Sequence, residues 1–406
     1  MPDVKGDPQC GSPENAIPPL KGVRVLDLGQ IYNGPYAGLL LALAGADVVK
    51  VEPPGGESLR NRPKVNGAEY PFLALNASKR MIALDLKDSD DRGIFMSLAK
   101  RADVVLENYA PGVMNRLGLD YESLRSANPR LIYASSSGYG EDGAYADLLA
   151  MDLTVQAMSG VMDATGFAEN PPVKAGAALC DFFGGIHLYG GIVTALVKRE
   201  RTGCGSRVEV SMMDAVIPSL LSNLAPVMMG IDMGVSRTGN HHGGLAECPY
   251  NVYRVRDGYV AIICVSERHW QDLVKCMARE ELLEDPNYVT KAARVERMEE
   301  VDALVEEWTS KLRRDEVMRR LRQSGVPVAP VRTLAEVASD QVLLERGSLQ
   351  DVEHPGRGRV RLINSPIRYG SGVVSKMKAA GAIDQDRLEI IQEWLGIDGE
   401  DPGWGR

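Results

Sequence analysis

The residues best suited to chemistry in this sequence are aspartates, because the usual partners of other nucleophiles are scarce. The chain of 406 residues contains five histidines and six cysteines, and no two cysteines form a CxxC pair. Serine or cysteine catalysis usually needs a neighbouring base, most often histidine, and no histidine here lies in a motif that offers such a partner. A carboxylate needs no base, since an aspartate with a pKa of about 3.9 is ionised at neutral pH.

The candidate that stands out is Asp152, at the head of the stretch DLTVQAM, whose apolar residues have helical spacing. Aspartate is a preferred N-cap residue, so the local pattern alone favours a structural role. The same carboxylate could attack an activated acyl group such as a thioester, giving a mixed anhydride and a free thiolate. Asp147, also in this region, is an equal candidate on chemistry alone. Local physics does not choose between these interpretations.

A second feature is a set of basic residues that follow the turns of the first half of the chain. Each one singly is best read as a solvated charge. Together, on one side of a sheet, they could hold a polyphosphate. The set comprises Arg60, Arg62, Lys79, Arg80 and Arg116.

The elements that must position these residues alternate between strand and helix. VRVLDL predicts a buried strand, YAGLLLALAG a helix and ADVVKVE a second strand, which together form a βαβ unit and imply a parallel sheet. The pattern therefore predicts an α/β fold, with a Rossmann-like, doubly wound large domain. Further strands are expected at 81–86, 103–109, 130–140 and 206–213, with a long apolar helix at 181–203.

The character of the sequence changes near residue 216, where glycines and histidines become frequent. Beyond it, YNVYRVRDGYVAIICV predicts a β-hairpin with Asp257-Gly258 as its turn, and 291–323 is charged and helical. We therefore expect a smaller α+β domain. The expected boundaries are a leader at 1–20, the first part of the large domain at 21–219, the small domain at 220–330 and a return to the large domain, with a C-terminal tail, at 331–406.

Composition narrows the classes of partner. A net charge of -9 argues against a nucleic-acid binder, since it leaves no broad basic surface to neutralise phosphates. The sequence has no run of about 18 apolar residues that would predict a membrane span. Its polar N-terminus lacks the pattern of a secretory signal. Scattered single cysteines are typical of a reduced protein. These features together predict a cytoplasmic protein.

The glycine turn GQIYNGPYAG raises the alternative of a dinucleotide site, since it lies between a strand and a helix. Glu52 ends the next strand, about where such folds place a ribose-binding acid. However, Gly29, Gly34 and Gly38 do not make GxGxxG, and Pro35 removes an amide that would face a pyrophosphate. A tight turn in any α/β fold explains the glycines equally well.

Several longer stretches carry a resemblance to a known family. They are GVRVLDL, NGPYAGLLLALAGADVVKVEPPGGESLR, NASKRMIALDLK, DVVLENYAPGVMNRLGLDYESL, MDLTVQAMSG, TGCGSRVEVSMMDA and GVPVAPVRTLAEV. In this order they resemble the class III CoA-transferases, the family of formyl-CoA:oxalate and carnitine CoA-transferases, from about residue 20 to 370. The resemblance implies an interlocked dimer of two-domain chains, most simply a homodimer, although a hetero-oligomer with a paralogue stays open.

The resemblance also implies roles for individual residues. Asp152 would be the aspartate that becomes acylated, and Gly243 and Gly244 would lie in a mobile loop over the site. The substrates would be an acyl-CoA, possibly succinyl-CoA, and a small carboxylic acid, with no permanently bound cofactor. The residues at CoA-contacting positions of the family are Arg60, Lys79, Asn108, Tyr109 and Arg116.

Two departures from the family put the substrate in question. Ser137 occupies a position that is lysine in some relatives, and the loop NHHGGLAEC is not the all-glycine form. His241, His242 and Glu247 in and beside this loop suggest a metal site, but no further ligands follow at the usual spacing, so we expect none.

Two alternative functions remain open. The same superfamily contains α-methylacyl-CoA racemases, which use a histidine and an aspartate as an acid–base pair. Here Met151 precedes Asp152, and no histidine occurs before His187, so that pair is missing. The other alternative is a CoA-binding partner subunit whose active site lies on a different chain. The presence of Asp152 argues against it.

Overall fold

The computed structural model describes residues 17–63, 65–369 and 375–396, so most of the expected leader lies outside the described residues. The chain divides into two compact units. The first contains Met1–Val155, Ala178–Val216 and Asp340–Arg406, and the second contains Gln156–Ala177 and Ile217–Ser339. The second unit thus includes 156–177 in addition to a segment close to the expected small domain.

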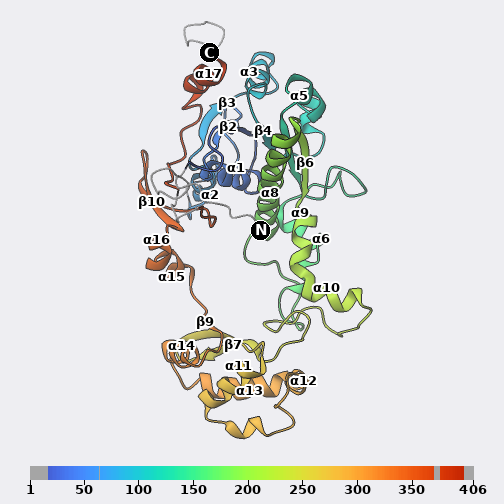
Figure 1. Ribbon diagram of the computed structural model, residues 1–406, viewed down its shortest axis with the longest axis vertical. Helices are drawn as coiled ribbons and strands as arrows, with labels where there is room; N and C mark the ends of the chain where they lie inside the picture. The colour runs from blue at the N-terminus through green and yellow to red at the C-terminus, as the bar shows by residue number, and fades with distance from the viewer. Residues whose placement is uncertain (1–16, 64, 370–374, 397–406) are drawn as a thin grey trace, which may run out of the picture. The chain divides into compact units, whose positions relative to one another are not determined.

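The first unit is built on a six-stranded parallel sheet with the order β3-β2-β1-β4-β5-β6 (Figure 1). This is the doubly wound arrangement, and it confirms the predicted α/β class. Strands at its centre, such as the one containing Val104, Val105 and Leu106, are apolar and fully buried because helices cover both faces of a parallel sheet. The strands are β1 (Arg24–Asp27), β2 (Asp47–Glu52), β3 (Arg80–Ala83), β4 (Val104–Glu107), β5 (Ile132–Ser137) and β6 (Ser206–Ser211).

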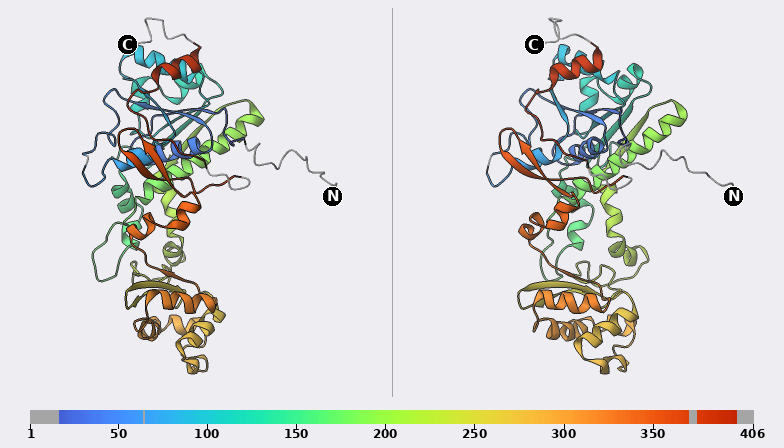
Figure 2. Two further views of the ribbon diagram at one scale, coloured as in Figure 1. Left: turned by 90° about the vertical axis from the view of Figure 1, so that its left-hand side faces the viewer. Right: turned by 60° about the vertical axis from the view of Figure 1, so that its left-hand side comes forward.

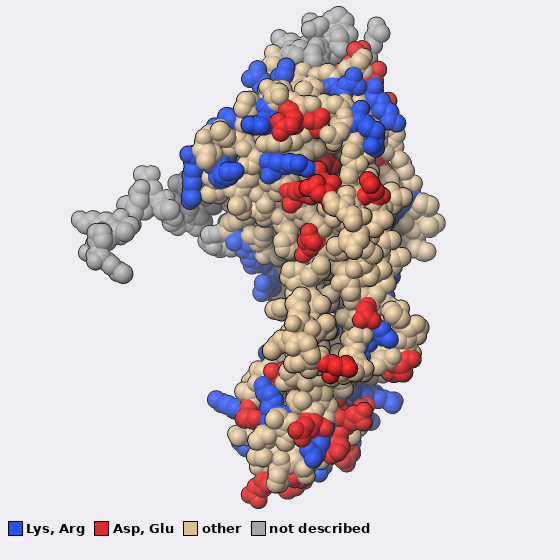
Figure 3. Space-filling view, turned by 90° about the vertical axis from the view of Figure 1, so that its right-hand side faces the viewer, with Lys and Arg blue, Asp and Glu red and all other residues tan. Residues whose placement is uncertain are grey.

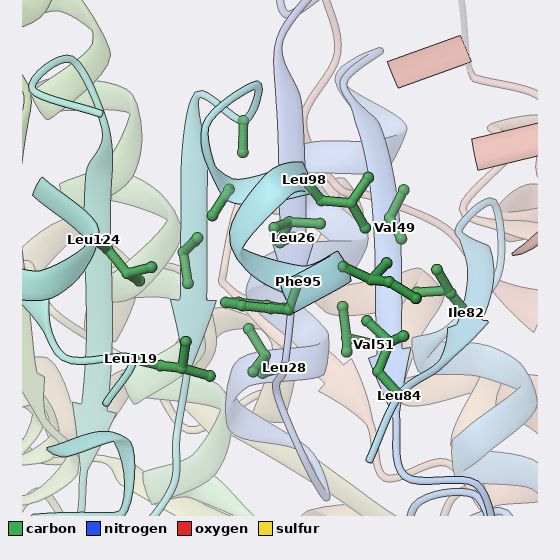
Figure 4. Packing of buried hydrophobic residues seen from close by; sticks show 14 of the residues in the cluster. Leu26, Leu28, Val49, Val51, Ile82, Leu84, Phe95, Leu98, Leu119 and Leu124 are labelled. Carbon is green, nitrogen blue, oxygen red and sulfur yellow. The ribbon is translucent and has the colours of Figure 1, made fainter. Parts of the chain in front are cut away.

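One face of the sheet is covered by α3 (Ser89–Ala99), whose N-terminus is capped by Asp88. Phe95 and Leu98 of this helix are fully buried and lie against strand residues such as Leu26 (Figure 4). The C-terminal helix α17 (Arg387–Leu395) lies beside α3 and adds to the same core (Figure 2). This packing anchors the last described helix of the chain on the sheet.

The other face is covered by α1 (Asn33–Leu43) and the long helix α8 (Leu179–Thr202), which pack on each other. Their close approach needs glycine, since a Cβ added at Gly184 would lie 2.1 Å from Asn33 Nδ2. Among the described helices, α8 alone has the length and apolar composition to span a membrane. Its buried residues, among them Leu188 and Ile192, pack in the core of this unit.

Shorter elements complete the first unit. The strands β10 and β11 pair antiparallel as a ribbon. Helix α6 (Asp152–Met158) begins in this unit with the aspartate singled out above, and its residues from Gln156 onward belong to the second unit. The others are α2 (Tyr70–Leu75), α4 (Val113–Leu117), α5 (Tyr121–Ala127), α9 (Met212–Val216), α16 (Gln341–Glu345), β10 (Leu349–His354) and β11 (Gly358–Ile363).

The second unit is an α+β body around a three-stranded antiparallel sheet. Val255 pairs with Gly258 across the turn of β7 (Tyr250–Val255) and β8 (Gly258–Ile263), which confirms the predicted hairpin. Trp270 of α11 is buried in its core. The remaining elements are α7 (Val161–Ala164), η2 (Ile217–Leu220), α10 (Leu221–Met228), α11 (Glu267–Met277), η3 (Glu280–Leu283), α12 (Lys291–Val295), α13 (Met298–Thr309), α14 (Arg314–Gln323), β9 (Val328–Pro330) and α15 (Leu334–Ala338).

Charged side chains of both signs lie on the face of the molecule shown in Figure 3. On the face shown in Figure 3, lysine and arginine are interspersed with aspartate and glutamate, and uncharged residues separate them. This distribution agrees with the net charge of -9. The face in view thus resembles an ordinary solvated surface.

Candidate active site

The site lies where the strand order of the first unit reverses, between β1 and β4. In open α/β sheets, ligands bind outside the carboxyl ends of the strands at this switch point. Two residues join the loops that follow these strands. Gln30 N donates to Asn108 Oδ1 at 2.6 Å, and Asn108 Nδ2 donates to Gln30 O at 3.0 Å. Asn108, predicted to contact CoA, therefore holds the loop after β1 against the loop after β4.

A cavity of about 480 Å³ opens at this edge of the sheet. The loops after β1 and β4 form part of its wall, and the end of β5 with the following glycine turn forms another part. Segment 146–151 and the first turn of α8 complete it, the latter through Asp181. Elements far apart in the sequence thus form the wall of one cavity.

Asp181 is the one carboxyl among the described residues that line this cavity. It is 8% exposed and lies in the first turn of α8. Within the part of the chain that the structure describes, no hydrogen bond is made to its side-chain oxygens. Burial, together with the nearby charge of Asp152, raises the pKa of Asp181 to about 7. A carboxylate of higher basicity is a stronger nucleophile once ionised, which suits attack on a thioester.

Asp152 lies beside Asp181 but is engaged differently. Its Oδ1 accepts hydrogen bonds from Cys180 N at 2.8 Å and Asp181 N at 3.3 Å, the amides of the first turn of α8. Asp152 therefore caps a helix distant in sequence, α8, as a carboxylate at a helix N-terminus does. The sequence analysis did not single out Asp181. Asp181 could have been found from its position at the start of an apolar helix that contains a pair of glycines.

Two further residues from the sequence analysis lie near this site. Asp147 is exposed, so the surrounding protein does little to raise its reactivity. Ser137 ends β5 and lines the cavity, where its Oγ accepts from Gly140 N at 3.0 Å. A neutral side chain thus stands where some relatives have a lysine.

Lys79, a predicted CoA contact, is buried beneath the first glycine turn. Its Nζ donates to Asp27 Oδ2 at 2.7 Å, Pro35 O at 2.9 Å and Asn76 Oδ1 at 3.0 Å. Burial lowers the pKa of Lys79 to about 8, although Asp27 opposes that shift. All three protons of the ammonium group therefore already have acceptors.

Arg60, a second predicted CoA contact, also makes internal interactions. Its Nη2 lies 2.6 Å from Glu52 Oε1, its Nη1 donates to Gly381 O, and its guanidinium stacks over Phe72. Glu52 is 1% exposed and additionally accepts from Glu57 N. The acid that a dinucleotide site would use for ribose is thus already paired, which argues against that alternative.

Tyr109 and Arg116 lie together in a second cavity of about 540 Å³, which shares Gln30 and Tyr109 with the first. Burial raises the pKa of Tyr109 to about 12, so its hydroxyl stays protonated. Arg116 is exposed in α4. Of the predicted CoA contacts, Asn108, Tyr109 and Arg116 thus line one or both of two adjoining cavities.

The predicted loop residues belong to the second unit. Gly243 packs closely, since a Cβ there would lie 2.6 Å from Asn223 Oδ1, and one at Gly244 would lie 3.0 Å from Ser222 O. His241 fixes the start of this loop, because its Nε2 lies 2.6 Å from Asp302 Oδ2 on α13. The segment is thus held at one end by the hydrogen bond between His241 and Asp302.

We predict that this pair makes stability depend on pH. The hydrogen bond to Asp302 raises the pKa of His241 above its usual value. Because the pKa of His241 is higher in the folded than in the unfolded protein, protonation of His241 stabilises the native state. This stabilisation is complete below about pH 6.5, the pKa of an unperturbed histidine, and is lost as the pH rises through the pKa of the folded protein. Melting temperatures between pH 6 and pH 9 should fall more for the wild type than for His241→Gln or Asp302→Asn. Equal slopes would contradict the assignment.

The other residues considered for a metal are also engaged. Glu247 forms an ion pair with Lys291 at 2.8 Å, and His242 packs edge-on against Tyr250. Across the described ranges, no group of three or more histidine, cysteine, aspartate or glutamate side chains has the geometry to hold a metal ion.

Comparison with known proteins adds three kinds of similarity. A family model described as "CoA-transferase family III" matches residues 20–387. The chain is 35% identical to a formyl-CoA:oxalate CoA-transferase of Streptomyces coelicolor, covering 94% of this chain and 96% of the relative. It is 36% identical to a succinyl-CoA:mesaconate CoA-transferase of Haloarcula hispanica, covering 92% and 96%. A CaiB/BaiF family protein from Brucella suis has a similar structure, with a TM-score of 0.79, 34% identity and coverage of 93% and 99%.

Proposed function

The chain belongs to CoA-transferase family III and is a CoA-transferase, and from this premise we propose that an aspartate of the Asp152–Asp181 pair carries the acyl group during transfer. CoA moves from an acyl-CoA donor to a carboxylic acid through an aspartyl-acyl anhydride and an aspartyl-CoA thioester. The observation that carries the proposal is the carboxyl of Asp181, buried yet lining the cavity at the switch point.

We assign the acyl group to Asp181, with Asp152, the residue indicated by the family resemblance, as the alternative. Hydrogen bonds from two amides disperse the charge of Asp152 and hold it against α8. Asp181 has no such bonds within the described residues and faces the cavity. On this assignment, Asp152 positions the first turn of α8 and keeps the carboxyl of Asp181 basic by repulsion.

The transfer balances without a metal or a nucleotide. A carboxylate oxygen attacks the thioester carbon, the C–S bond breaks, and CoA leaves as thiolate. The thiolate attacks the aspartyl carbon of the anhydride and releases the donor acid. The acceptor carboxylate then attacks this aspartyl thioester, giving a new anhydride and the thiolate. Attack of the thiolate on the acyl carbon forms the new acyl-CoA and restores the aspartate.

The proposed CoA site follows the two adjoining cavities of the first unit, which share Gln30 and Tyr109. Arg116 would pair with phosphates at the exposed end, and Asn108 and Tyr109 would line the path toward Asp181. Arg60 and Lys79, already paired internally, would act by shaping the adjoining turns. The loop carrying Gly243 and Gly244 would shield the anhydride from water and offer amides to its oxyanions.

The substrates are a small acid and its CoA thioester. Relatives are named for formyl-CoA, acetyl-CoA and succinyl-CoA donors, and we propose a donor of this class, with succinyl-CoA as one of the thioesters to be assayed. We further propose a homodimer of interlocked chains, as the family resemblance implies, and a cytoplasmic location, as the composition predicts.

Trapping with hydroxylamine tests the covalent step. The protein is incubated with an acyl-CoA, hydroxylamine is added, and peptides are analysed by mass spectrometry. We expect loss of activity that needs both reagents, with a hydroxamate on Asp181 and none on Asp152. Modification of Asp152 alone would return the role to that residue, and modification of neither would overturn the mechanism. A racemase would instead exchange the α-hydrogen with solvent deuterium.

A further inference from the structure

Two polar side chains beside the proposed nucleophile have no hydrogen-bond partner in the described structure. Asn33 is 1% exposed, and neither its Nδ2 nor its Oδ1 has a partner. Ser136 of β5 is 2% exposed, and its Oγ likewise has none. Buried polar groups are nearly always hydrogen-bonded, because the desolvation penalty of a buried donor or acceptor is otherwise not compensated. These two orphans line the same cavity as Asp181.

The position of Asn33 is fixed by its packing on α8. Its amide lies where a Cβ of Gly184 would be, at 2.1 Å from Nδ2, and Gly184 follows Asp181 by almost one helical turn. Residues at this spacing lie on the same face of a helix. The backbone oxygen of Asn33 blocks a Cβ at Gly185 in the same way, at 2.7 Å. Asn33 is therefore held close to the carboxyl that we assign to the chemistry.

The chemical character of the lining indicates the kind of ligand. Among the described residues that surround this cavity, Asp181 supplies the carboxyl, and there is no lysine, arginine or histidine. A ligand carrying a second carboxylate would find no cation there. An amide and a hydroxyl both donate and accept hydrogen bonds. A neutral group that also does both, such as a hydroxyl or an amide, is their natural complement.

We propose that Asn33 and Ser136 form a neutral hydrogen-bonding subsite beside Asp181, which holds a substrate group that both donates and accepts. This inference rests on the proposed function. Small rotations about the side-chain torsions of both residues turn their polar atoms into the cavity when the substrate arrives. The group has two sources, a hydroxyl on the acyl chain or the amide of the pantetheine arm of CoA, and experiment separates them.

The first experiment measures kcat/KM for matched acids, propanoate with 2-hydroxypropanoate and butanoate with 3-hydroxybutanoate, in the wild type, Asn33→Ala and Ser136→Ala. If the acyl hydroxyl is bound, the wild type prefers the hydroxy acid at least tenfold, and the variants lose that preference. If the pantetheine amide is bound, the variants lose at least tenfold with every acid and their KM for acyl-CoA rises. Unchanged kinetics in both variants would overturn the subsite.

The second experiment measures melting temperature without substrate. Removing an unmet buried polar group should raise it by about 1–3 °C in either variant. Asn364 is a matched control, since it is a buried asparagine whose amide donates to Gly347 O and Ser375 O. Asn364→Ala should lower the melting temperature and leave substrate preference unchanged. A fall in melting temperature for both Asn33→Ala and Ser136→Ala would contradict the orphan assignment.

Failure of the subsite differs from failure of the proposed function. If the wild type transfers CoA and forms a hydroxamate, but both variants match it, only the subsite is wrong. If the wild type neither transfers CoA to any acid nor forms a hydroxamate, the transfer mechanism itself is wrong.

Discussion

Replacing Asp181 by alanine is expected to lower CoA transfer by about 10³- to 10⁵-fold, because the variant has no oxygen with which to form the anhydride. The effect should fall on kcat, since Asp181 is one small part of the cavity that binds CoA. The binding of CoA, followed by calorimetry, should change by less than about threefold. An Asp181→Ala enzyme that keeps wild-type turnover would exclude Asp181 as the acyl carrier.

Asp152→Asn is the matched comparison, since it alters the neighbouring carboxyl. The amide oxygen of asparagine can still accept from Cys180 N and Asp181 N, so the cap on α8 is largely preserved. We expect a loss of about tenfold or less, because removing the charge of Asp152 reduces the basicity of Asp181. If Asp152→Asn is inactive while Asp181→Ala is active, the roles are the reverse of our assignment.

The pH dependence of stability provides a readout independent of activity. The pKa of Asp181 is raised from the usual 3.8 to about 7 in the folded state. Because the folded protein binds this proton more tightly than the unfolded chain does, the protonated carboxyl contributes fully to the free energy of unfolding below about pH 4. This contribution is lost as the pH rises through 7, at no more than about 1.4 kcal/mol per pH unit. Asp181→Asn should therefore gain stability over the wild type at pH 8 and lose that gain at pH 4. Parallel unfolding curves would contradict a buried, ionising Asp181.

Local sequence patterns predicted most of the sheet because they depend on neighbouring residues. VRVLDL and ADVVKVE read as buried strands of a parallel sheet, and β1 and β2 form there. The hairpin at Asp257-Gly258 followed from its turn residues alone. The long apolar helix was expected at 181–203 and spans Leu179–Thr202. The periodicity of apolar residues and the identity of the turn residues suffice to predict these elements.

The site was harder to predict because it depends on contacts between distant segments. Asp152 reads as the cap of its own helix, whereas its carboxylate accepts from amides of α8, 28 and 29 residues away. Lys79 reads as a solvated charge, whereas its side chain is fully buried against Asp27. Burial and partner are properties of the folded chain. A sequence therefore names the chemically capable residues more readily than it assigns their roles.

Lys79→Met is expected to destabilise the first unit by about 3–5 kcal/mol, the second large effect that we predict. Its side chain and that of Asp27 are both fully buried, with Nζ and Oδ2 2.7 Å apart. Removing the ammonium leaves Asp27 with the Gly29 amide, at 2.7 Å, as its remaining hydrogen-bond donor from the adjoining turn. Removing one member of a buried ion pair destabilises a protein far more than replacing both members, because the remaining charge is buried without a partner. Urea unfolding followed by circular dichroism measures the loss.

The double variant Asp27→Asn/Lys79→Met separates the two roles considered for Lys79. Neutralising Asp27 removes the unpaired charge, so we expect recovery of about half or more of the lost stability. If Lys79 acts by holding the glycine turn, the refolded double variant binds CoA within about threefold of the wild type. If Lys79 contacts a CoA phosphate, as the family resemblance implies, affinity falls at least tenfold despite the restored fold, because a charge-assisted hydrogen bond is lost. The three internal acceptors of its ammonium group lead us to expect the first result.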